Sequence, residues 1–173
     1  LKKIGVNIEF TQKQIEEYVR CAKDPIYFIR EFVKIIHVDH GLIPLDLLEY
    51  QERMVSTFND NRFVITKMPR QSGKSTAVVG YILHYILFNQ DKNVALLANK
   101  AELARELLDR LKKAYENLPL WLQQGIVVWN KGSIELENGS KIIATSTTGS
   151  AARGQSFSQV FLDEFAFVPH GLA

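Results

Sequence analysis

The sequence predicts an α/β fold in which a mostly parallel β-sheet is flanked by helices. Two observations support this prediction. Short apolar runs such as Asn93 to Ala98 alternate with longer stretches of helical periodicity, and strands that alternate with helices form parallel sheets. Another apolar run, Val160 to Leu162, ends directly in Asp163-Glu164, as expected of a buried parallel strand that reaches the edge of its sheet.

Composition sets limits on the class of protein. The chain has 173 residues, of which 46% are hydrophobic and 23% charged, enough for one medium-sized globular domain with its own core. The net charge of +2 is too small to indicate a nucleic-acid surface by itself. A single cysteine, Cys21, excludes an internal disulfide framework and favours a reducing compartment. The chain has no apolar stretch of membrane-spanning length and no signal-peptide pattern, so we expect no membrane partner.

Helix signals dominate the first third of the chain. Thr11 to Gln14 form a capping box ahead of a helix that should end near Ala22. Asp24-Pro25 starts a second helix, with Asp as the N-cap and Pro in the first helical position. Its apolar face is expected to carry Phe28, Phe32, Ile35 and Ile36. We expect a loop from His37 to Asp46 and a helix from Leu47 to Phe58. Residues 1–59 are therefore predicted to be a helical segment, and residues 60–173 the core.

A phosphate-binding motif opens this core. The predicted strand Arg62 to Thr66 leads into Gly73-Lys74-Ser75, and a helix from Lys74 to Phe88 follows. Backbone N–H groups at such a helix start face an anion, and the helix dipole favours negative charge there. In a P-loop, Lys74 reaches the β- and γ-phosphates of ATP, and the Ser75 hydroxyl binds Mg²⁺. The ATP-binding residues would then be Arg70, Gln71, Ser72, Gly73, Lys74, Ser75 and Thr76.

The match to this motif is incomplete, because Met68 stands where the first glycine of G-x-x-x-x-G-K-[ST] is expected. Gly-Lys-Ser alone also occurs by chance at a helix start. The location between a predicted strand and a predicted helix favours the P-loop interpretation, as does the Asp-Glu pair that follows about 90 residues later.

Asp163 and Glu164 supply the carboxylates that phosphoryl transfer requires. Asp163 suits the coordination shell of the Mg²⁺ held by Ser75, and Glu164 suits a base that orients the attacking water. The alternative is an acidic loop after a core strand. An adjacent Asp-Glu pair is typical of P-loop NTPases with a catalytic glutamate, the RecA- and helicase-like branch.

Three short strands are predicted between the two motifs: Ile126 to Trp129, Ser133 to Glu137 and Lys141 to Ser146. Asn138-Gly139 between the last two is a strong hairpin signal. In the catalytic-glutamate branch, a further strand normally follows Asp-Glu and lies between the two motif strands. Only nine residues follow Glu164, so we expect the ATPase domain to be incomplete at its C-terminus.

Taken together, these residues resemble the N-terminal ATPase region of the large terminase subunit of tailed bacteriophages, most closely the T-even type. The resemblance extends from about Cys21 to Val168. It rests on Asp24 to Ile29, Tyr50-Gln51, Arg70 to Ser75, Trp129 to Leu136, Arg153-Gly154 and Asp163-Glu164. This family also lacks the first P-loop glycine and places an arginine inside the loop, as here.

The resemblance implies further site residues. Gln51 matches a glutamine that reads adenine, for which an amide offers one donor edge and one acceptor edge. Arg70 matches an arginine proposed to contact the γ-phosphate within its own subunit. Arg153 matches an arginine proposed to enter the site of a neighbouring subunit. Either guanidinium offsets transition-state charge, and the sequence leaves open which one does so.

The implied function is ATP hydrolysis that drives double-stranded DNA into a phage capsid. The implied partners are DNA, gripped mainly through its backbone, the portal protein, the small terminase subunit and further copies in a ring. The implied location is the host cytoplasm, at the portal vertex of the procapsid. The family's nuclease domain is expected to be absent from this chain.

Two alternatives remain. One is a helicase or translocase ATPase of superfamily 2, although Phe165-Ala166 after Asp-Glu favours a terminase. The other is a nucleotide-binding module without turnover, because the strand expected after Asp-Glu is missing. Either way, hydrolysis by the isolated chain is expected to be weak or absent. His37, His40, His84 and His170 show no zinc-ligand spacing with cysteine, so no zinc is predicted.

Overall fold

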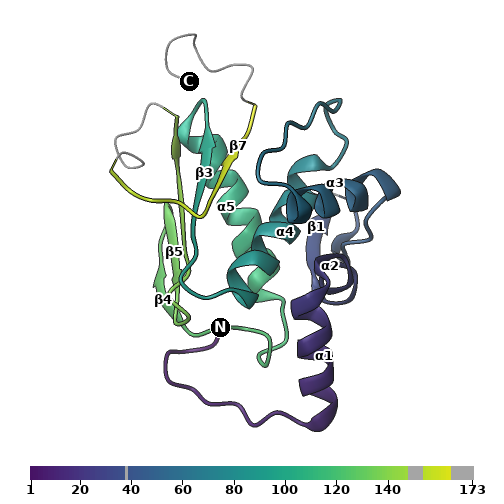
Figure 1. Ribbon diagram of the computed structural model, residues 1–173, viewed down its shortest axis with the longest axis vertical. Coiled ribbons are helices and arrows are strands. Elements are labelled where there is room, and N and C mark those ends of the chain that lie inside the picture. The colour runs from purple at the N-terminus through teal and green to yellow at the C-terminus, as the bar shows by residue number, and fades with distance from the viewer. Residues whose placement is uncertain (38, 148–153, 165–173) are drawn as a thin grey trace. The chain divides into compact units, whose positions relative to one another are not determined.

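The computed structural model describes residues 1–37, 39–147 and 154–164 (Figure 1). Packing divides the chain into two compact units, each described below by itself. The sheet unit comprises Leu1–Val6, Asn89–Asp109 and the described part of Gln124–Ala173. The helical unit comprises Asn7–Phe88 and Arg110–Gln123. The division predicted from sequence, at residues 59 and 60, stays a prediction.

The helical unit begins with two helices whose starts match the sequence signals. Helix α1 (Gln12–Lys23) is capped by Thr11, which forms the predicted capping box with Gln14. Helix α2 (Pro25–Phe32) is capped by Asp24, whose Oδ1 accepts hydrogen bonds from the backbone N–H groups of Ile26 and Tyr27. These caps satisfy donors that a helix start leaves without an intrahelical partner.

Helix α4 (Lys74–Phe88) is the centre of this unit and has the predicted bounds. Gly80 allows close packing against α2, because a Cβ there would lie 3.0 Å from Ile29 Cγ1. His84 is buried, and its Nε2 lies 2.8 Å from the Cys21 carbonyl oxygen. Burial lowers the pKa of His84 and raises the pKa of the Cys21 thiol to about 12. Cys21 therefore packs as a small apolar residue.

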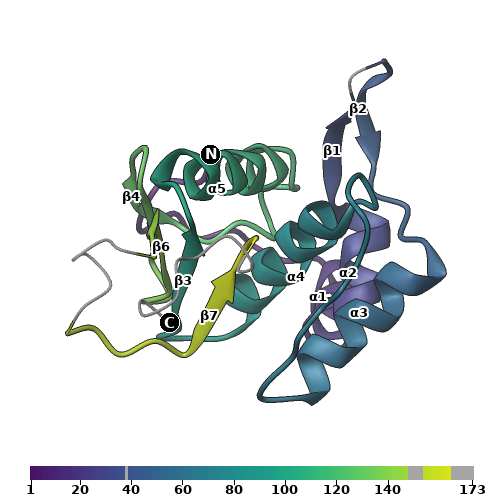
Figure 2. The same cartoon turned by 90° about the horizontal axis from the view of Figure 1, so that it is seen from above.

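A β-hairpin replaces the end of the predicted second helix, at Ile35-Ile36, and the loop predicted from His37 to Asp46. Strands β1 (Lys34–His37) and β2 (Gly41–Pro44) pair antiparallel, and the hairpin is visible in Figure 2. The paired residues include Ile35 with Ile43 and Ile36 with Leu42. Isoleucine favours extended backbone because its branched Cβ restricts the side chain. Gly41, at φ +69°, starts the second strand.

The strand predicted from Arg62 to Thr66 is not formed. Helix α3 (Glu49–Asp60) ends just before it, and no described residue forms ladder hydrogen bonds with residues 62–66. Phe63 is 85% exposed and Ile65 98% exposed. The prediction was wrong because the apolar residues have strand propensity, but a strand also requires a neighbouring strand to accept and donate its backbone hydrogen bonds.

The sheet unit contains a five-stranded mixed sheet with strand order β4-β5-β6-β3-β7. Its strands are β3 (Asn93–Ala98), β4 (Ile126–Trp129), β5 (Ser133–Leu136), β6 (Lys141–Ser146) and β7 (Gln159–Leu162). Strand β3 is parallel to β6 and to β7, whereas β5 is antiparallel to both β4 and β6. The prediction of a mostly parallel sheet was therefore wrong, because the consecutive strands β4, β5 and β6 are joined by short turns that permit only antiparallel pairing.

Local turn chemistry explains this antiparallel half. The predicted Asn138-Gly139 turn joins β5 to β6, and Gly139 has φ +80°. The Asn138 side chain donates a hydrogen bond to the Asn89 carbonyl oxygen at 3.2 Å. This bond joins the turn to the residues just before β3. At the preceding turn, Asn130 Oδ1 accepts hydrogen bonds from the Gly132 and Ser133 backbone N–H groups.

Helix α5 (Ala101–Glu116) follows β3, and the boundary between the two units falls within it, after Asp109. Its apolar face is buried through Leu107, Leu108 and Leu111. In the part of the chain that the structure describes, no helix combines the length and the apolar character needed to cross a membrane.

Candidate functional site

The Gly-Lys-Ser loop (residues 70–75) connects segment 62–69, which forms no strand pairing with the described residues, to α4. Gln71 and Gly73 both have a left-handed backbone, with φ angles of 60° and 68°. This conformation suits glycine but is unfavourable for glutamine, so surrounding contacts must hold Gln71 in it. The Gly73 carbonyl oxygen accepts hydrogen bonds from Thr76 N and Ala77 N at 3.1 Å, which starts the helix.

Two side chains from the first turn of α3 hold the loop. The Tyr50 hydroxyl donates to the Ser72 carbonyl oxygen at 2.8 Å, and Gln51 Nε2 donates to the same oxygen at 3.2 Å. Gln51 is buried, and its Oε1 accepts a hydrogen bond from Leu48 N at 2.9 Å. The Gln51 amide therefore joins the start of α3 to the loop.

Gly73 is required by this arrangement. A Cβ at Gly73 would collide with Gln51 Nε2, so only glycine allows the amide and the loop to approach so closely. The predicted role of Gln51 in reading adenine stays a prediction. Each of its two polar atoms already has one backbone partner, and each retains one further donor or acceptor position.

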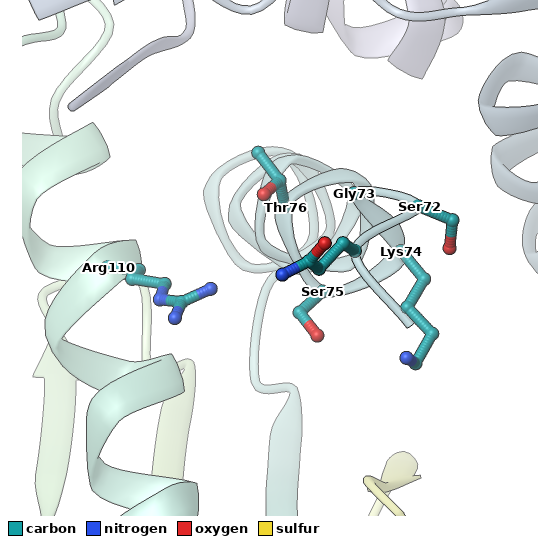
Figure 3. Close-up of a pocket in the computed structure, with 7 residues that line it drawn as sticks. Ser72, Gly73, Lys74, Ser75, Thr76 and Arg110 are labelled. Carbon is teal, nitrogen blue, oxygen red and sulfur yellow. The ribbon is translucent and has the colours of Figure 1, made fainter. Parts of the chain in front are cut away.

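A polar cavity of about 320 Å³ lies against this loop. It is lined by residues 71–76 and by Arg110 of α5, all within the helical unit (Figure 3). The Lys74 and Ser75 side chains are half-buried, and both are drawn at the start of α4 in Figure 3. The first backbone N–H groups of a helix and the positive end of its dipole favour an anion. The cavity thus suits a phosphate group.

The six predicted site residues that line this cavity, 71–76, are consecutive in sequence. The seventh lining residue, Arg110, was not predicted. It lies in the middle of an amphipathic helix with many charged residues, where nothing in the sequence distinguishes it from Arg105 or Lys113. Arg70, which was predicted to contact a γ-phosphate, is exposed and does not line the cavity. Its role stays a prediction.

Asp163 and Glu164 follow β7 at the carboxyl end of the parallel part of the sheet. Asp163 N donates to the Leu97 carbonyl oxygen at 2.8 Å, which extends the β3–β7 ladder by one bond. Glu164 N donates to Asp163 Oδ1 at 3.1 Å, and Glu164 has a left-handed φ of 50°. Ligands of open α/β sheets bind outside the carboxyl ends of the strands, so both carboxylates lie at the edge where chemistry is expected.

Two further polar side chains lie at this edge, and sequence reasoning did not select either. Asn99 follows β3 and Thr147 follows β6; Thr147 N donates to the Ala98 carbonyl oxygen at 2.9 Å. Asn99 Oδ1 and Thr147 Oγ1 are buried oxygen atoms without a hydrogen-bond partner among the described residues. Such atoms are uncommon in folded proteins. Asn99 follows the strand that pairs with β7, whereas Thr147 follows β6, on the other side of β3.

The predicted site residues lie in two parts of the structure. Residues 71–76 line one cavity in the helical unit and Gln51 is hydrogen-bonded to their loop, whereas Asp163 and Glu164 lie in the sheet unit. Arg153, the second predicted arginine, lies outside the described residues. The predicted magnesium site between Ser75 and Asp163 stays a prediction.

Each part of the predicted site contains an oxygen group of a type that binds magnesium. Nucleotide-bound Mg²⁺ needs only one or two protein oxygens, because phosphates and water complete its shell. The Ser75 hydroxyl and the Asp163 carboxylate supply such oxygens. Among the described residues, no group of three or more His, Cys, Asp and Glu side chains is placed to hold a metal ion.

Comparison with known families shows to which family the chain belongs. Residues 65–172, more than half of the chain, match the family described as terminase large subunit, T4likevirus-type, N-terminal. The chain belongs to this family. The match begins just before the Gly-Lys-Ser loop and includes Asp163 and Glu164. The resemblance inferred from the motifs is therefore confirmed, and the chain is part of a phage terminase.

A solved structure gives the same result for the fold. The chain is similar to the HK97 bacteriophage large terminase, with a TM-score of 0.69 and 20% sequence identity over 85% of this chain. The similar region spans 32% of the HK97 chain. At this identity the likeness establishes the fold, a mixed α/β architecture.

Proposed function

We propose that this chain is the nucleotide-hydrolysing part of a large terminase, in which ATP hydrolysis drives double-stranded DNA into a phage procapsid. The finer fold assignment, a P-loop NTPase with a catalytic glutamate, is part of the proposal. The observation that supports it most is the cavity at the start of α4, lined by Gly73, Lys74, Ser75 and Thr76. The family membership of the chain points to the same function.

The loop residues would bind the nucleotide. Backbone N–H groups of residues 71–76 and the dipole of α4 favour the phosphates, and Lys74 would contact the β- and γ-phosphates. Tyr50 and Gln51 hold the loop in place through the Ser72 carbonyl oxygen. Because the loop is fixed before binding, less conformational entropy is lost when the nucleotide binds.

The two carboxylates would have different roles. Asp163, together with Ser75, would hold Mg²⁺, which neutralises charge on the phosphates. Glu164 would orient the attacking water and accept its proton. The left-handed backbone at Glu164 is consistent with this role, since unfavourable backbone conformations persist where function requires a side chain in a set direction.

The remaining predictions complete the proposal. Arg70 or Arg153 would offset charge in the transition state. The assembled motor would be a ring on the portal, in the host cytoplasm, with the small terminase subunit as a further partner. DNA would be bound mainly through phosphates, so its binding should weaken with salt.

The test is steady-state ATP hydrolysis by wild type and Glu164→Gln, together with binding of a fluorescent ATP analogue. We expect Glu164→Gln to retain binding and to lower turnover by roughly 10²- to 10⁴-fold, the usual contribution of a general base. Glu106→Gln is the matched control, because Glu106 is an exposed carboxylate on α5.

Three results would separate the alternatives. Equal turnover by Glu164→Gln and wild type would contradict the assigned base. Binding that depends on Lys74 without any turnover would favour the nucleotide-binding module. Neither binding nor turnover would contradict the proposal for this chain.

A further inference from the structure

Arg110 lines the cavity from a different element than the other residues. Six of the seven lining residues belong to the Gly-Lys-Ser loop and the start of α4, and the seventh is Arg110 of α5. Figure 3 shows its guanidinium extending from α5 toward the loop, whereas Lys74 extends on another side of the loop. The cavity is thus approached by two cations from two directions.

The Arg110 side chain has no competing partner among the described residues. Glu106 lies four positions earlier on the same helix, a spacing at which an Arg–Glu ion pair commonly forms. No ion pair or hydrogen bond joins Arg110 to Glu106 or to any other described residue. The guanidinium is therefore available to a ligand in the cavity, and binding requires no existing ion pair to be broken.

We propose that Arg110 binds the phosphates of the nucleotide from the wall opposite Lys74, and so is a nucleotide-binding residue of this site. The inference rests on the function proposed above. Lys74 of a P-loop contacts the β- and γ-phosphates. Arg110, on another side of the loop, faces the remaining end of the polyphosphate, at the α- and β-phosphates.

The chemistry of arginine suits this contact. A guanidinium presents several N–H donors in a plane and binds two phosphate oxygens at once, whereas an ammonium acts as a point charge. Arg110 is exposed, so water screens part of the attraction. We therefore expect a moderate effect, about tenfold in affinity.

The experiment measures dissociation constants of the 173-residue chain for fluorescent ATP and ADP analogues, at low and at moderate salt. The variants are Arg110→Ala, Arg110→Lys, Lys74→Ala and Arg105→Ala. Arg105→Ala is the matched control, because Arg105 is an exposed arginine on the same helix that does not line the cavity. Circular dichroism verifies that helix content is unchanged.

Arg110→Ala should weaken the binding of ATP and of ADP by the same factor, roughly tenfold, because both nucleotides have α- and β-phosphates. Its affinity should also depend less on salt than that of wild type, since one charge contact is lost. The nucleotide affinity of Arg110→Lys should lie between those of Arg110→Ala and wild type. The affinity of Arg105→Ala should equal that of wild type. A role limited to supporting α5 would give neither the salt effect nor the partial recovery with lysine.

Two results would overturn the inference while leaving the proposed function intact. One is wild-type affinity in Arg110→Ala when Lys74→Ala abolishes binding. The other is a loss confined to ATP, which would place Arg110 at the γ-phosphate. No binding by wild type would instead contradict the proposed function of this chain, and the inference with it.

Discussion

The Gly-Lys-Ser loop and the Asp163-Glu164 turn are held in different ways. The loop follows a segment without strand partners, and side chains of Tyr50 and Gln51 hold it at a single carbonyl oxygen. The turn follows β7, whose backbone is bonded to β3 along its whole length and one residue beyond. The loop therefore depends on a few side-chain contacts, whereas the turn depends on the core of the sheet.

The largest effect should come from the sheet core. Leu96 of β3 is fully buried and pairs in register with Phe161 of β7. Leu96→Ala should lower the free energy of unfolding of the sheet unit by about 2–5 kcal/mol, from lost transfer energy and a residual cavity. Ile65→Ala, in the unpaired segment before the loop, should change stability by less than about 0.5 kcal/mol.

Amide hydrogen exchange measures this difference, because it reports each unit separately even if the chain does not unfold in one step. Comparable losses for Leu96→Ala and Ile65→Ala would show that segment 62–66 is packed in solution, and the comparison between the two regions would fail.

The next effect concerns the loop. Gly73→Ala forces alanine into a left-handed backbone and into contact with the Gln51 amide. We expect a loss of about 1–3 kcal/mol in the free energy of unfolding of the helical unit. Gln51→Ala alone should cost about 0.5–1.5 kcal/mol, the usual value of a lost hydrogen bond.

The double variant separates collision from backbone strain. If the collision dominates, Gly73→Ala with Gln51→Ala should be less destabilised than the sum of the two single variants. Tyr50→Phe is the control, because it removes the other hydrogen bond to Ser72 without making room for a Cβ. Strict additivity would assign the whole cost to the left-handed backbone.

The smallest effect is a pH dependence limited to the helical unit. Burial lowers the pKa of His84 below the value of about 6.5 that it has in the unfolded chain. Between these two pKa values the unfolded state binds more protons. Stability from His84 is thus fully present above pH 6.5 and is lost as the pH falls through the lowered pKa.

Hydrogen exchange between pH 7 and pH 5 should therefore show that the free energy of unfolding of the helical unit falls as the pH is lowered. His84→Gln should make this pH dependence less steep. His40→Gln, at an exposed histidine of the same unit, is the control. An unchanged slope in His84→Gln would assign the acid sensitivity to other groups.

Elements with strong local signals were predicted well. The caps at Thr11 and Asp24, the bounds of α4 and β3, and the Asn138-Gly139 turn all match the structure. Each depends on hydrogen bonds or periodicity within a few residues, which the sequence specifies directly. The loop residues of the candidate site were found for the same reason.

Elements that depend on distant partners were not predicted. Ile35 and Ile36 continue the helical spacing of Phe28 and Phe32, so the first strand of the β1–β2 hairpin was interpreted as the end of a helix and the rest as a loop. Segment 62–66 has strand propensity but no strand beside it among the described residues. Arg110 lines the cavity because the second part of α5 belongs to the helical unit, and it lies 34–39 positions from residues 71–76 in the sequence.

The unpaired segment also affects how the chain behaves in concentrated solution. Arg62-Phe63-Val64-Ile65-Thr66 combines β-branched and aromatic residues without proline, and Phe63 and Ile65 are almost fully exposed. Free backbone N–H and C=O groups in such a stretch are a template for pairing with the same stretch of another molecule. Self-association of this chain should therefore increase with protein concentration through edge-to-edge contacts, without any involvement of the nucleotide site.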